Sequence, residues 1–356
     1  MHLQNIGNIR EHIEKIEEKT LSSFACLSSR TRGRAYPEKE CPIRPAFQHD
    51  RDRIVHSKAF RRLEDKTQVF LSPQGSHYRN RLTHTLEVSQ IARTVAKALF
   101  LNESLTEAVA MGHDLGHTPF GHAGERALNR LHKKGFRHEK QSLRVVESIA
   151  KSGRGLNLTS EVKDGILNHS KGMGKIKTRK SIPFTLEGQV VRLSDIVAYI
   201  NHDIDDACRS GILKSKDIPH FELIGESSSR RINAFVRNMI KTSHEHIMSE
   251  DAFITLDDSF HKIIEDIRQF MFENVYNSGE IRKEFRKAET VVEFLFEYFM
   301  ENYNELQSYY SPFLSGEKET NIVDFIASLT DNYAITLYNS LFIPKRMKYP
   351  GCFDEN

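Results

Sequence analysis

The segment from Ala110 to Glu125 is dense in side chains that can do chemistry. It contains His113, Asp114, His117, His122 and Glu125 within thirteen residues. An imidazole next to a carboxylate offers two types of metal ligand at once. Burying such groups without partners is costly, and clusters of them mark functional sites more often than cores. The segment therefore predicts an active site, and its four glycines and one proline allow a tight backbone path there.

Two other segments supply groups of the same kind. Residues 81–96 read as a helix whose apolar face passes near His84, so this imidazole can point inward. Residues 188–208 read as a buried helix, along which Asp195, Tyr199 and Asp203 follow one another at four-residue intervals. This spacing places the three side chains in one stripe. A buried stripe of this kind needs polar partners, which a metal and a sugar-phosphate ligand would supply.

The groups expected to bind metal are His84, His113, Asp114 and Asp195. The gaps between them are 29 residues from 84 to 113 and 81 residues from 114 to 195. Mixed imidazole and carboxylate ligands suit a divalent ion, with Mn, Mg, Fe or Zn all compatible.

Composition narrows the class of protein. The 356 residues carry 51 basic and 48 acidic side chains, a net charge of +3, which excludes a strongly basic nucleic-acid-binding protein but not a local basic patch. Four cysteines without a C-x-x-C pair favour a reducing compartment. The first residues lack the pattern of a signal peptide, and no run of 18 apolar residues occurs. We therefore expect a cytoplasmic protein with no membrane span.

The periodicity of apolar residues predicts an all-α fold, because alternating strand patterns are nearly absent. Helices are expected over 7–19, 47–64, 81–96, 106–115, 120–132, from 137 through 149, 188–208 and much of 229–340. We expect an N-terminal helix and Arg-bearing arm over 1–46, a metal-dependent core over 47–210 and a helical C-terminal region over 211–356. The arm, with Arg30, Arg32 and Arg34, and the basic loop within 171–180 read either as anion-binding segments or as solvated loops.

The ordered motifs resemble those of the HD-domain metal phosphohydrolases. The runs 81–88, 113–125 and 195–203, together with 30–37, 60–69 and 324–338, are similar to the dGTPase-like branch of bacterial deoxynucleoside triphosphate triphosphohydrolases. The resemblance covers roughly residues 20–345. It implies an HD-domain helical core elaborated by additional N- and C-terminal helices.

The resemblance also implies roles for individual residues. His84, His113, Asp114 and Asp195 would hold the metal, and His122 with Glu125 would form the catalytic pair. His117 and His138 would line the phosphates, and Arg81 would contact the α-phosphate region. Gln68, Tyr199 and Asp203 would meet the deoxyribose. The expected reaction releases a deoxynucleoside and tripolyphosphate from a deoxynucleoside triphosphate.

Two other readings stay open at this point. The chain could be another HD phosphohydrolase, acting on nucleoside monophosphates, cyclic nucleotides or alarmones. It could instead be a nucleotide- or nucleic-acid-binding regulator with vestigial hydrolysis, which the local arginines of 30–34 and 51–62 permit. A homo-oligomer, and a nucleotide effector or single-stranded DNA as ligand, are further expectations. The sequence does not specify the preferred base or whether His122 acts as acid or base.

Overall fold

The computed structural model describes residues 8–68, 79–170, 182–249, 251–310 and 316–344, and these ranges are helical, with only two isolated β-bridges. The α-helices are α1 Ile9–Thr20, α2 Ala46–Val55, α3 Lys58–Arg62, α4 Arg81–Ala98, α5 Glu103–Gly112, α6 Gly121–Leu131, α7 His138–Arg144, α8 Ala150–Gly153, α9 Ser160–Asn168, α10 Leu186–Arg209, α11 Phe221–Ile224, α12 Ser228–Met248, α13 Asp258–Met271, α14 Gly279–Glu301, α15 Leu306–Tyr309, α16 Lys318–Ser328 and α17 Asp331–Phe342. Short 3-10 turns cover Ser28–Arg30, Leu63–Asp65, Ser215–Asp217 and Tyr303–Glu305, and π-helical turns cover Val145–Ile149 and Phe272–Tyr276. The all-α prediction is confirmed. Within the described ranges no helix is long and apolar enough to cross a membrane.

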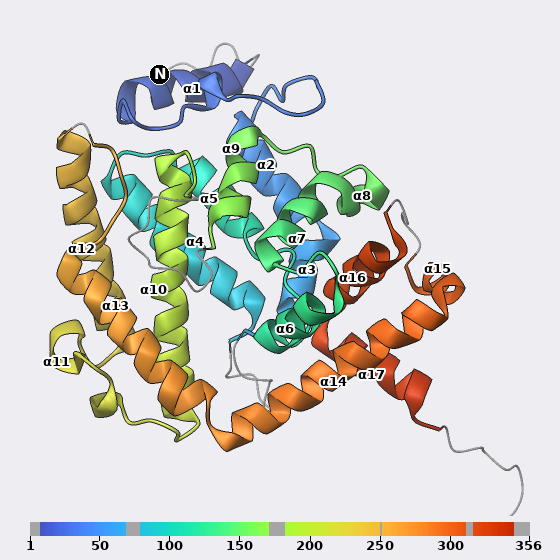
Figure 1. Cartoon of the computed structure of the whole chain (residues 1–356). Coiled ribbons are helices and arrows are strands. Elements are labelled where there is room, and N and C mark those ends of the chain that lie inside the picture. The colour runs from blue at the N-terminus through green and yellow to red at the C-terminus, as the bar shows by residue number, and fades with distance from the viewer. Residues whose placement is uncertain (1–7, 69–78, 171–181, 250, 311–315, 345–356) are drawn as a thin grey trace, which may run out of the picture.

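Helix α10 runs through the middle of the larger hydrophobic core. It contacts α4, α5, α9, α12 and α13, and Figure 1 shows it standing between α4 and the α12–α13 pair. Most of its 24 residues are buried, apolar and polar alike. A helix surrounded by other helices is expected to be apolar on nearly all faces, so the polar residues along α10 require specific partners.

A second core joins the C-terminal helices to α6. Buried side chains of α6, α14, α16 and α17 form it, with Phe299 and Phe325 at its centre, and Figure 1 shows these helices grouped together. Arg126 on α6 forms an ion pair with Glu289 on α14 at 2.8 Å, which adds a polar contact at the edge. The helix that carries His122 and Glu125 is therefore held by the C-terminal region.

Two expected elements differ from the structure, and a third cannot be compared with it. The single helix expected over 47–64 is two helices, because the Ser57 hydroxyl caps α3 by accepting from the Phe60 amide and the chain turns at His56. The helix expected to carry the His-Asp pair ends at Gly112, so that His113 and Asp114 lie just beyond it. The basic loop within 171–180 lies outside the described residues.

The N-terminal arm uses two of its three arginines in structural contacts. The Arg34 guanidinium pairs with the buried Asp50 carboxylate and with Glu38, and the Arg32 guanidinium stacks 4.0 Å from the centre of the Phe184 ring. The Arg34 charge is neutralised in this way, whereas the Arg32 guanidinium keeps its charge. Anion binding by the arm therefore stays a prediction for Arg30 and Arg32, whereas Arg34 already has carboxylate partners.

Candidate active site

The loop after α5 turns sharply to place the His-Asp pair beside α6. Gly116 lies so close to α7 that an added Cβ would be 2.1 Å from the Ser142 amide nitrogen. Phe120 has a left-handed backbone with φ of 60°, and its amide donates to the Asp331 carboxylate at 2.8 Å. The loop conformation therefore depends on a glycine and on an anchor from the start of α17.

Three of the four expected metal ligands come together between α4, α5 and α10. His84 Nε2 lies 3.0 Å from Asp195 Oδ1, and His113 Nε2 lies 3.8 Å from the same oxygen. His113 Nδ1 lies 2.6 Å from the Ala110 carbonyl, so Nδ1 carries the proton and Nε2 keeps its lone pair. That Nε2 is buried and has no hydrogen-bond partner. An unpartnered imidazole nitrogen next to a second imidazole and a carboxylate fits a divalent metal.

Asp114 lies at the edge of this group and is shared with an arginine. Its Oδ2 is 3.5 Å from His113 Nε2 and accepts from the Arg81 guanidinium at 2.7 Å. Burial raises the pKa of Asp114, but the neighbouring His113 and Arg81 outweigh it and hold the pKa well below its usual range. Arg81, expected at the α-phosphate, therefore also neutralises an expected metal ligand.

A chain of hydrogen-bonded groups runs beside the metal ligands. Glu125 Oε1 accepts from His138 Nδ1 at 3.1 Å and from the His138 amide at 3.0 Å. His138 Nε2 lies 3.3 Å from His169 Nε2, and His169 Nδ1 donates to the Ile166 carbonyl at 2.7 Å. Burial lowers the pKa of His138, but Glu125 outweighs it and raises the pKa to about 9. His138 is thus a buried cation, suited to contact a phosphate.

His117 and His122 complete this side of the site. The His117 ring stacks on the His138 ring with centroids 4.5 Å apart, and burial together with the Arg81 charge lowers its pKa well below 6.5. The His122 side chain is 64% exposed, with Nδ1 3.7 Å from Glu125 Oε2, which is longer than a good hydrogen bond. The expected catalytic pair is therefore close together, yet Glu125 is bonded to His138 instead.

The polar stripe on α10 faces a partner from the C-terminal region. Asp203 Oδ2 accepts from the Tyr276 hydroxyl, and Asp203 Oδ1 is buried without a partner. Burial raises the pKa of Asp203 to about 8 despite the Tyr276 hydrogen bond. Burial likewise raises the pKa of Tyr199. Gln68 is linked to the site through Arg81, whose guanidinium donates to the Gln68 backbone oxygen at 3.4 Å. The Gln68 Oε1 atom is also buried without a partner.

Sequence reasoning missed several residues of this site. His169 and His202 each follow an asparagine in a polar run. His202 also lies seven residues after Asp195, on the same face of α10, and this spacing could have predicted that it lies near the site. Tyr276 lies on a π-helical turn far along the chain, and no pattern in the sequence indicated that it contacts the site.

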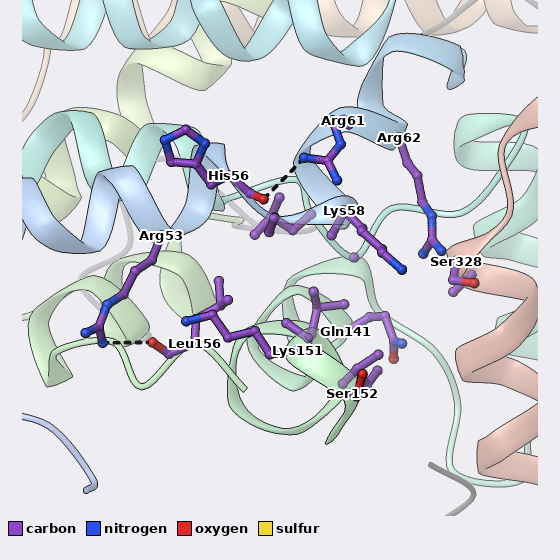
Figure 2. A pocket seen from close by; sticks show the side chains of 18 of the residues that line it. Arg53, His56, Lys58, Arg61, Arg62, Gln141, Lys151, Ser152, Leu156 and Ser328 are labelled. Carbon is purple, nitrogen blue, oxygen red and sulfur yellow. Dashed lines mark hydrogen bonds between the residues drawn. The ribbon is translucent and has the colours of Figure 1, made fainter. Parts of the chain in front are cut away.

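A separate basic cavity of about 680 Å³ adjoins the loop of the His-Asp pair, with Leu115 and Gly116 in its wall (Figure 2). Its basic lining residues are Arg44, Arg53, Lys58, Arg61, Arg62, Lys66 and Lys151. Both lining carboxylates already pair with arginines, whereas in the described part of the chain no carboxylate lies within ion-pair distance of Lys58, Arg62 or Lys151. Lys151 also has a left-handed backbone, with φ of 50°. Free cations and local strain around a cavity suit an anionic ligand.

Comparison with known proteins defines the class. Residues 81–200 match the HD domain family model, and residues 254–340 match the model of the phosphohydrolase-associated domain. This is an HD-domain phosphohydrolase. The "Deoxyguanosinetriphosphate triphosphohydrolase-like protein" of Caldanaerobacter subterraneus subsp. tengcongensis is 50% identical, over 97% of this chain and 99% of its own length. Proteins of the same name from Desulfatibacillum aliphaticivorans and Clostridium perfringens are 48% and 45% identical, over 95% and 96% of this chain and 99% of their own lengths. The chain belongs to the family of deoxyguanosinetriphosphate triphosphohydrolase-like proteins.

Proposed function

We propose that the protein hydrolyses deoxynucleoside triphosphates, dGTP or dNTPs generally, to deoxynucleoside and tripolyphosphate, and so controls nucleotide pools. The observation that carries this proposal is a set of buried polar atoms with no partner: His113 Nε2, His117 Nδ1, Gln68 Oε1 and Asp203 Oδ1. Such atoms are rare in a folded protein and call for a ligand. The set combines a metal-binding nitrogen with hydrogen-bonding groups, as a metal-bound nucleotide requires. The names of the relatives support the same substrate class.

His84, His113, Asp114 and Asp195 would hold the divalent metal, with Mn, Mg, Fe or Zn as candidates. When bound, the ion supplies charge stabilisation for the phosphate and acidifies water. Asp195 and Asp203 lie eight residues apart on α10, about 12 Å along the helix. With Tyr199 and Asp203 on the deoxyribose, the α-phosphate falls closest to Asp195.

The remaining residues act on charge and protons. Arg81 and the cationic His138 neutralise charge that develops on the phosphates, and neutral His117 donates a hydrogen bond to them. His122, exposed at the start of α6, exchanges a proton either with the leaving 5′-oxygen or with water. Glu125 keeps His138 charged and lies close enough to orient His122 once substrate is bound.

Product identification tests the reaction. The metal-loaded protein is incubated with each dNTP in ¹⁸O-labelled water. Attack at the α-phosphorus places the label in tripolyphosphate and leaves the nucleoside unlabelled. Formation of dNDP or dNMP as the first product would overturn the proposed orientation and favour another HD phosphohydrolase activity. Salt-dependent binding of single-stranded DNA without turnover of any nucleotide would favour the regulator.

The basic cavity supports a second proposal, that a nucleotide effector binds there through its phosphates. Its volume lies within the ordinary range of ligand sites, and Lys66 connects it to the active site by donating to the His117 carbonyl. Hydrolysis of one dNTP is then measured with and without a second. Arg62→Gln should abolish stimulation and keep the basal rate, whereas Lys97→Gln, on the exposed end of α4, should change neither. If a second dNTP still stimulates hydrolysis fully in Arg62→Gln, the effector does not bind in this cavity.

A further inference from the structure

We infer that Glu87 and His202 form a positioning relay that fixes the tautomer of His84 and so prepares it to bind the metal. The inference rests on the proposed metal site. His84 Nδ1 lies 3.2 Å from His202 Nδ1, and His202 Nε2 contacts the Glu87 carboxylate. Three side chains thus form a line that leads from the metal site, between α4 and α10, to a partly exposed carboxylate.

The proton positions follow from the carboxylate at the end of the line, which lies against His202 Nε2. An ionised Glu87 can only accept, so His202 Nε2 carries a proton. A neutral His202 then has a lone pair on Nδ1, which accepts from His84 Nδ1–H. His84 Nε2 is left without a proton, and it faces Asp195 Oδ1 at 3.0 Å.

Two acceptors that face each other at this distance need a cation between them or beside them. The relay therefore leaves two facing lone pairs, on His84 Nε2 and Asp195 Oδ1, that a bound metal ion would accept. The proton of His113 is also on Nδ1, but without a relay, because Nδ1 donates directly to the Ala110 carbonyl. Metal-binding histidines commonly use such outer partners, and their loss typically lowers metal affinity by about 10–100-fold.

The two helices hold the relay in register. His84 and Glu87 are three residues apart on α4, and Asp195 and His202 are seven apart on α10, so each pair shares one face. Arg79 keeps the Glu87 carboxylate ionised and in place with a contact of 3.2 Å. The His84 and His202 rings meet nearly edge to face, with an interplanar angle of 85°.

A cavity of about 450 Å³ opens on the relay and gives a means of testing it. Glu87, His202 and Arg79 line it together with residues of α4 and α12, among them Gln90. Removing the imidazole by His202→Gly joins its space to this cavity. Free imidazole can then enter and replace the missing ring.

The test measures the affinity of the full-length chain for Mn²⁺ by equilibrium dialysis. His202→Gly and Glu87→Gln should each bind Mn²⁺ about 10–100-fold more weakly than the parent. Added imidazole should restore the affinity of His202→Gly and leave that of Glu87→Gln low. Gln90→Ala, which alters the same cavity without touching the relay, should bind Mn²⁺ as the parent does.

Nitrogen-15 spectra of the metal-free protein give a readout that does not depend on loading. They should show the His84 proton on Nδ1, and a proton on Nε2 would overturn the inference. Parent-like Mn²⁺ affinity in both variants would overturn it too. A third outcome would also overturn it: a His202→Gly protein that unfolds at the same temperature as the parent but still binds Mn²⁺ weakly at saturating imidazole. A parent chain that binds none of Mn²⁺, Mg²⁺, Fe²⁺ and Zn²⁺ would instead refute the proposed metal site, so the two failures can be told apart.

Discussion

At the scale of single residues, the Glu125 carboxylate has the largest influence on its neighbours. It holds His138 as a buried imidazolium, which in turn donates to His169 and stacks on neutral His117. Two imidazoles in ring contact thus carry different charges, because Glu125 raises the pKa of His138 whereas burial and the Arg81 charge lower the pKa of His117. In the proposed reaction, this division would place one cationic and one neutral imidazole beside the same phosphate chain.

The coupling predicts how stability depends on pH. The folded-state pKa of His138 is raised to about 9, above the unfolded value of about 6.5. Its contribution to stability is therefore complete below pH 6.5 and is lost as the pH rises through 9. In the metal-free protein the free energy of unfolding should fall over this window, by more than about 1 kcal/mol, since one pKa unit corresponds to about 1.4 kcal/mol.

Glu125→Gln should remove most of that fall, since the uncharged amide no longer raises the pKa of His138. Urea denaturation at pH 6.5, 7.5 and 9 measures the effect. Glu245→Gln, on the exposed face of α12, is the matched control and should retain the parent's slope. Equal slopes in the parent and Glu125→Gln would show that His138 is not cationic in the folded protein.

At the scale of elements, the start of α17 acts as a clamp on the active-site loop. The Asp331 carboxylate accepts from the Thr67 amide at 3.0 Å, from the Thr67 hydroxyl and from the Phe120 amide. Thr67 precedes Gln68, and Phe120 has the left-handed backbone that directs the chain into α6. One carboxylate therefore joins the segment that carries Gln68 to the loop that carries the active-site histidines.

Replacing that carboxylate should affect both stability and activity. Asp331→Ala leaves buried donors without an acceptor, a loss of about 1–3 kcal/mol for such groups. We also expect a lower kcat, because Phe120 directs His122. Urea denaturation and steady-state kinetics measure the two effects. Asn332→Ala, at the neighbouring exposed position, should change the free energy of unfolding and kcat much less. Equal losses in the two variants would argue against the clamp.

At the scale of the whole molecule, two cores share one active site. The larger core positions His84, His113 and Asp195, whereas α6, with His122 and Glu125, belongs to the second core. The domain division at 47–210 and 211–356 stays a prediction, but the cores do not follow it, because α6 packs on α14 and shares the second core with α16 and α17. Loosening the C-terminal helices should therefore disturb the chemistry.

Phe299→Ala tests this dependence. Phe299 is fully buried in the second core, and such truncations cost about 3–5 kcal/mol. We expect a lower denaturation midpoint and a loss of turnover at temperatures where the parent is stable. Phe272→Ala, at a side chain that is 54% exposed, should shift stability by less than about 0.5 kcal/mol. Similar midpoints for both variants would show that the second core contributes little.

The sequence by itself determined the helical class, the family and the types of ligand. Apolar periodicity reports which face of a helix is buried, and the spacing of Asp195, Tyr199 and Asp203 placed them on one stripe before any fold was known. Only the tertiary structure decided which groups pair. Glu125 bonds to His138, thirteen residues away, although His122 is three residues away on its own helix. The relay from Glu87 through His202 crosses between α4 and α10, and Tyr276 reaches Asp203 from another helix. Periodicity is a property of one helix, whereas these contacts depend on how several helices pack. They therefore could not be predicted from the sequence alone.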